Sequence, residues 1–68
     1  MRILLNGEQH ELEGPANVRD AVLATGATEE GRGVAVALDG EVVPRGRWDD
    51  VALADGARVE VVQAVQGG

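Results

Sequence analysis

Only one segment of this chain carries the apolar repeat of an amphipathic helix, and that segment is short. Val18, Ala21, Val22 and Thr25 are spaced i, i+3, i+4 and i+7, which places them on one narrow stripe. A helix of this length is not stable alone in water, because few hydrogen bonds offset the cost of its nucleation. The stripe therefore predicts a helix that a sheet must hold.

Residues at both ends of this segment are typical of helix caps. Asn17, followed three positions later by Asp20, predicts an N-cap with an acid in the first turn. Gly26 is well placed to end the helix, since glycine readily adopts the left-handed conformation found there.

The other apolar residues alternate with polar ones, which is typical of short strands with one face on a core. Strands are expected over residues 1–5, 9–13, 34–38 and 41–43, and a last one over 59–62, before the pattern fades past Ala64. Asn6-Gly7, Asp39-Gly40 and Asp55-Gly56 are turn signals, and Asn-Gly favours a hairpin turn that needs positive φ at both central positions. The inward residues are expected to be Met1, Ile3, Leu5, Leu12, Val34, Val36, Leu38, Val59 and Val61.

The order of elements predicts one α+β domain. Two strands, a helix, two strands and a final strand fit few topologies, and the β-grasp, a mixed sheet of four to five strands packed on one helix, is among them. The 68 residues contain no Cys, so the core must be aliphatic, with Trp48 as its only aromatic and as a packing anchor for the loop after Pro44. We expect residues 1–64 to form the domain and residues 65–68 a flexible tail.

Charge argues against several classes of partner. Twelve acidic residues against six Arg give a formal net charge of −6, which repels nucleic acids and anionic lipid surfaces. No apolar run approaches the roughly 20 residues of a membrane span, and none has the form of a signal peptide, so a cytoplasmic location is expected. Lys is absent, which fits either a codon bias toward Arg or the avoidance of amines beside an activated carboxyl.

Side chains offer little for catalysis or metal binding. His10 stands alone, and the acid pairs 29–30 and 49–50 are typical of solvated loops, so no metal site is expected. The glycines lack the spacing of a nucleotide loop, Ser and Cys are absent, and Thr25 and Thr28 have no nearby base. The remaining reactive group is the terminal carboxyl.

The chain ends in Gly67-Gly68. One interpretation is a frayed tail. The other is functional, because two residues without Cβ atoms can thread a narrow channel and leave the last carbonyl open to attack. Since the chain has no nucleotide site, a partner enzyme would have to activate the carboxylate of Gly68.

Three segments, residues 39–48, 1–7 and 55–68, resemble the ThiS family of bacterial sulfur carriers in thiamine thiazole synthesis. The most specific is Asp39-Gly40-Glu41-Val42-Val43-Pro44-Arg45 followed by Trp48, with Asp39 where Asn is common in the family. Residues 1–7 and 55–68 also fit in spacing, so the resemblance covers nearly the whole chain.

This resemblance implies a ubiquitin-like fold and a carrier that acts with partner enzymes rather than an enzyme. A ThiF-type enzyme would adenylate Gly68 with Mg-ATP, while the carrier itself would bind no cofactor. Sulfur from a cysteine desulfurase persulfide would then give a thiocarboxylate, and thiazole synthase would accept the sulfur. Gly67 corresponds to the family's tail residue that threads the channel of a partner enzyme. Val65 and Gln66 match the family only in being tail positions.

Strand alternation also predicts a surface for these partners. Ala37 and Val62 should face away from the helix with Leu4 beside them, and such an apolar patch is typical of a docking site. With Val65 and Gln66 of the tail, they are the predicted partner-binding residues. The alternative is that these are scattered surface aliphatics.

Three other functions stay open at this point. The small subunit of molybdopterin synthase shares the tail and the sulfur chemistry, but the segment 63–66 lacks the Phe and Pro typical of that family. A protein modifier or a carrier for another sulfur acceptor is the second. The third is a β-grasp interaction module whose terminal glycines are incidental.

Overall fold

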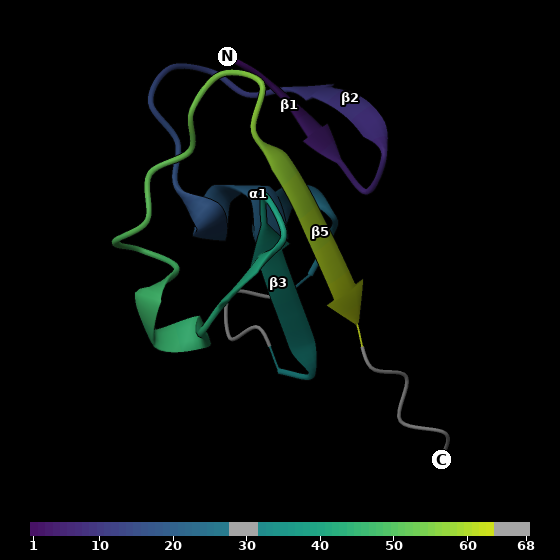
Figure 1. Ribbon diagram of the computed structural model, residues 1–68, viewed down its shortest axis with the longest axis vertical. Helices are drawn as coiled ribbons and strands as arrows, with labels where there is room; N and C mark the ends of the chain where they lie inside the picture. Colours follow the sequence, from purple (N-terminus) through teal and green to yellow (C-terminus); the bar gives the residue numbers. More distant parts are fainter. Residues whose placement is uncertain (28–31, 64–68) are drawn as a thin grey trace.

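The computed structural model describes residues 1–27 and 32–63, which form a mixed five-stranded sheet packed on one helix (Figure 1). The elements are β1 (Arg2–Leu5), β2 (Glu8–Glu11), α1 (Val18–Ala24), β3 (Val34–Leu38), β4 (Glu41–Val43), a 3₁₀ turn η1 (Arg45–Arg47) and β5 (Arg58–Gln63). The sheet order is β2-β1-β5-β3-β4, with the last strand in the centre. Because β5 runs parallel to β1 and antiparallel to β3, the predicted α+β β-grasp architecture is confirmed.

The core lies between α1 and one face of the sheet. The helix contributes the buried residues Val18, Ala21 and Val22, as the stripe predicts. The strands contribute the inward residues of their alternating pattern. Leu53 and Ala57, in the segment before β5, are buried as well. The buried strand and loop residues are Ile3, Leu5, Ala16, Ala27, Val36, Val43, Trp48, Leu53, Ala57 and Val59.

The ends of α1 are fixed by local hydrogen bonds. Asn17 Oδ1 accepts the Asp20 backbone N–H at 3.0 Å, and Asp20 Oδ2 accepts the Asn17 N–H at 2.8 Å, which confirms the N-cap. Gly26 has φ of 91°, as expected just beyond a helix end. Thr25 was wrong as a member of the apolar stripe, because it is the exposed C-cap and its hydroxyl donates to the Val22 carbonyl.

Trp48 anchors the loop that follows β4. Its side chain is only 1% exposed, and its indole Nε1–H donates to the Val43 carbonyl at 3.0 Å. The Arg19 guanidinium lies 5.7 Å from the ring centroid, within the range of a cation–π contact. Burial with a satisfied N–H confirms that this Trp packs in the domain.

The second strand is shorter than its sequence pattern predicts. β2 ends at Glu11 instead of Glu13, because its partner β1 begins at Arg2 and the ladder stops at the Arg2–Glu11 pair. Leu12 lies just beyond this end and is only half-buried, although it still packs against the core. Its N–H donates to the Met1 carbonyl at 2.8 Å.

Candidate functional site

The strand that leads to the C-terminus is fixed at the centre of the sheet. β5 pairs with β1 on one side, where the Leu4 and Asn6 N–H groups donate to the carbonyls of Ala57 and Val59, both at 2.9 Å. On its other side β5 pairs with β3 along five consecutive positions, from Leu38 to Val34. Pairing on both sides therefore fixes the position from which the chain leaves the sheet.

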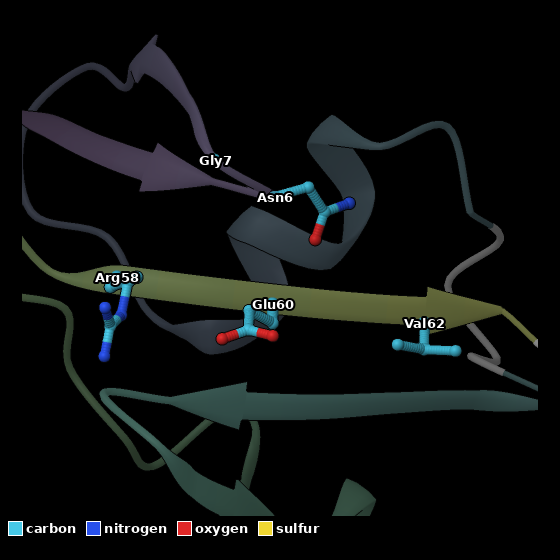
Figure 2. Close-up of a pocket in the computed structure, with 5 residues that line it drawn as sticks. All are labelled: Asn6, Gly7, Arg58, Glu60 and Val62. Atoms are coloured by element: carbon cyan, nitrogen blue, oxygen red, sulfur yellow. The ribbon is translucent and has the colours of Figure 1, made fainter.

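Two turn residues complete the pairing of β5 with their side chains. Asn6, with φ of 52°, accepts the Val61 N–H through Oδ1 at 2.7 Å, and Figure 2 shows its carboxamide directed toward β5. Asp39, with φ of 49°, accepts the Arg58 N–H through Oδ1 at 2.9 Å. Each of these residues reverses the chain with its backbone and binds β5 with its side chain. The two turns therefore help to position the strand that precedes the tail.

Three predicted docking residues lie on the sheet face opposite α1. Strand pairing places Leu4 beside Arg58 and Ala37 beside Glu60, and Val62 follows on the same face of β5. In Figure 2, Val62 lies along β5 on the near side of the strand, with α1 behind it. Val62 is 64% exposed, while Leu4 and Ala37 are half-buried. Their role in binding stays a prediction.

Two further apolar residues on this face were not predicted. Val42 is 77% exposed and lies opposite Ala37, and Ala35 lies opposite Val62. Alternation could have identified Val42, because its neighbour Val43 is the inward residue of β4. We call the set Leu4, Ala35, Ala37, Val42 and Val62 the outer apolar face.

A shallow hollow of about 420 Å³ lies beside β5 where β1 ends (Figure 2). Asn6 and Gly7 of the first turn line it, together with the outward side chains of β5, which are Arg58, Glu60 and Val62. The hollow therefore includes Val62, the residue of the outer apolar face that lies nearest the end of β5.

The predicted carrier residues themselves lie outside the described residues. Gly67 and Gly68, with the tail positions Val65 and Gln66, follow the end of β5 at Gln63. A chain extends by at most about 3.6 Å per residue, so Gly68 lies within roughly 18 Å of Gln63. A partner that acts on the terminal carboxylate must approach this end of β5.

The described residues contain no cluster of three or more His, Asp or Glu side chains that could hold a metal ion. His10 is half-buried and pairs opposite Ile3, and Asp49 forms an ion pair with Arg19 at 2.5 Å. The acid pair 29–30 lies outside the described residues.

Within residues 1–27 and 32–63, no helix is long and apolar enough to cross a membrane.

Comparison with known proteins agrees with this geometry. The model of the ThiS family matches residues 3–68. A crystal structure of the thiamine biosynthesis protein ThiS from Geobacter metallireducens is 30% identical, with a TM-score of 0.78 and full coverage of both chains. An NMR structure of a thiamine biosynthesis protein from the same organism is also 30% identical, with a TM-score of 0.79, covering this whole chain and 88% of that one. No curated protein sequence gives a significant match.

Proposed function

Because the chain belongs to the ThiS family, we propose that it is a sulfur carrier of thiamine biosynthesis whose working group is the Gly68 carboxylate. It acts as a co-substrate of partner enzymes rather than as a catalyst. The observation that carries the proposal is the extent of the family match, which runs from the first strand through the terminal glycines.

The proposed cycle places all activation chemistry on the partners. A carboxylate is a poor electrophile, so a ThiF-type enzyme uses Mg-ATP to convert Gly68 to an acyl adenylate. The terminal sulfur of a cysteine desulfurase persulfide then attacks the acyl carbonyl and displaces AMP. A thiol reductant cleaves the resulting acyl disulfide to the Gly68 thiocarboxylate, from which thiazole synthase takes the sulfur. The carrier needs no nucleophilic side chain for this cycle, in agreement with a sequence that has neither Ser nor Cys.

The body of the protein supplies a grip for these partners. The outer apolar face includes Val62 of β5, so an enzyme that docks on Val62 is close to the chain end that it must process. Val65 and Gln66 are proposed to contact the partner as tail positions, while Gly67 and Gly68 thread its channel. The net charge of −6 favours encounter with basic enzyme surfaces.

Intact-mass analysis tests the proposed function. The chain is incubated with a ThiF-type enzyme, Mg-ATP and a persulfide sulfur source, and we expect the mass to rise by the exchange of one oxygen for one sulfur. A variant that lacks Gly68 is the matched control. It should show no mass change and an unaltered thermal unfolding curve, because a chain end contributes little to a core. An unchanged mass of the full chain, under conditions that load another ThiS protein, would overturn the proposal.

A further inference from the structure

The first strand ends before the last one does, so within the described residues part of β5 has a neighbouring strand on only one side. The Asn6 N–H donates to the Val59 carbonyl. Successive residues of a strand direct their N–H and C=O groups to opposite sides, so those of Val61 and Gln63 point to the same side as Val59. The groups of Glu60 and Val62 point the other way, toward β3.

The backbone groups on this side are only partly satisfied. The Val61 N–H is bound by Asn6 Oδ1 at 2.7 Å, which replaces the next bond of the parallel ladder. Within the described residues, the pairing of β5 with β1 ends at the Leu5–Val59 pair, so no strand faces the Val61 carbonyl or the Gln63 N–H on this side. We call this stretch, Val61–Gln63 on the side of β1, the open edge.

A hollow lies beside the open edge in the described part of the chain. The hollow of about 420 Å³ adjoins it, with Val62 and Glu60 on its β5 side (Figure 2). Gly7, on the other side of the hollow, has no Cβ, and nothing lies within 4 Å of the position a Cβ would take. An extended chain can therefore approach the open edge, and the carboxamide of Asn6 limits how far it can extend toward β1.

We propose that the open edge pairs with an extended strand of the adenylating enzyme, which adds that strand to the sheet of the carrier. The inference rests on the proposed function. The enzyme that acts on Gly68 must lie within roughly 18 Å of Gln63, so its surface is held against this part of β5. Main-chain hydrogen bonds give affinity in such strand addition, while the exposed side chain of Val62 adds an apolar contact.

A proline at position 63 tests the open edge without removing any bond of the sheet. In an antiparallel ladder, hydrogen-bonded pairs alternate with pairs that exchange no hydrogen bonds. The Val34–Gln63 pair is of the second kind, because the Gln63 N–H points away from β3. Gln63→Pro therefore removes only the N–H that the partner strand would bind. Gln63→Ala is the matched control, since it removes the side chain but keeps the N–H. Circular dichroism and thermal unfolding establish that both variants are folded.

The affinity for a purified ThiF-type enzyme is then measured by calorimetry, with sulfur loading followed by intact mass. We expect Gln63→Pro to weaken binding at least tenfold, and Gln63→Ala to bind like the unmodified chain. Equal binding by a folded Gln63→Pro variant, while the unmodified chain is still loaded, would overturn strand addition and leave the proposed function intact. Failure of the unmodified chain to load would overturn the proposed function itself.

Amide hydrogen exchange gives an independent readout. Bound enzyme should slow exchange at the Gln63 N–H, whereas the Val62 N–H, which faces β3, should already be slow in the free carrier. Unchanged Gln63 exchange in the complex would contradict the proposal. A dimer of the free chain that Gln63→Pro dissociates, detected by sedimentation, would assign the open edge to a second copy instead and would likewise overturn it.

Discussion

The two faces of β5 differ sharply although they belong to one strand of six residues. Val59, on the face toward α1, is fully buried, whereas Val62, on the opposite face, is 64% exposed. The inner face is covered by the helix and the loop that Trp48 anchors. The outer face has no cover within the described residues. Substitutions on the inner face should therefore change folding, and those on the outer face should change binding.

The largest effect is expected from Trp48, the largest side chain of the inner side. Trp48→Ala should lower the free energy of unfolding by about 3–5 kcal/mol, through loss of packing and of the bond to Val43. A domain of this size has a total of about 3–10 kcal/mol, so much of the protein would unfold. Urea denaturation measures the loss. Trp48→Phe, which keeps most of the packing, should lose less, and an equal loss would contradict packing as the main term.

A smaller loss of stability is expected from one core valine, and this change has a counterpart on the outer face. Val36→Ala should destabilise by about 1–3 kcal/mol, because Val36 is 2% exposed and its truncation leaves a cavity. The same truncation at the exposed Val62 should cost less than about 0.5 kcal/mol. Thermal unfolding of the two variants compares them, and similar shifts in Tm would break the distinction between the faces.

A charge on the outer face should change binding while leaving folding intact. Val62→Asp should weaken binding to a ThiF-type enzyme by about tenfold, because a carboxylate would be desolvated in an apolar contact. Its melting temperature should stay close to that of the unmodified chain. The control is Glu8→Asp, a substitution at an exposed position of β2 outside the outer apolar face. Unaltered affinity of Val62→Asp would show that partners dock elsewhere.

The smallest effect concerns the helix that covers the inner face. Asn17→Ala should lower stability by about 1 kcal/mol, because the Asp20 N–H loses its acceptor at the start of α1. Asn17→Asp keeps an acceptor oxygen and should retain most of the stability, which chemical denaturation can resolve. A full loss in the Asp variant would mean that the contact of the Asn17 amide with the Asp49 carbonyl, at 3.3 Å, is the important one.

Short-range chemistry determined much of this protein from the sequence alone. Positive φ at Asn6 and Gly7, the capping of α1 by Asn17, and the inward positions of Ile3, Val36 and Val59 follow from residue types and from a period of two. The segment from Asp39 to Trp48 also indicated the family that the comparison confirms.

Tertiary structure decided which strands become neighbours and where they stop. Alternation shows which residues of a strand share a face, but it carries no information about partner or register, which depend on contacts distant in sequence. The Asn6–Val61 bond joins residues 55 positions apart, and the open edge beside it exists only because β1 ends first. The central place of β5 and the hollow next to it are products of the assembled sheet.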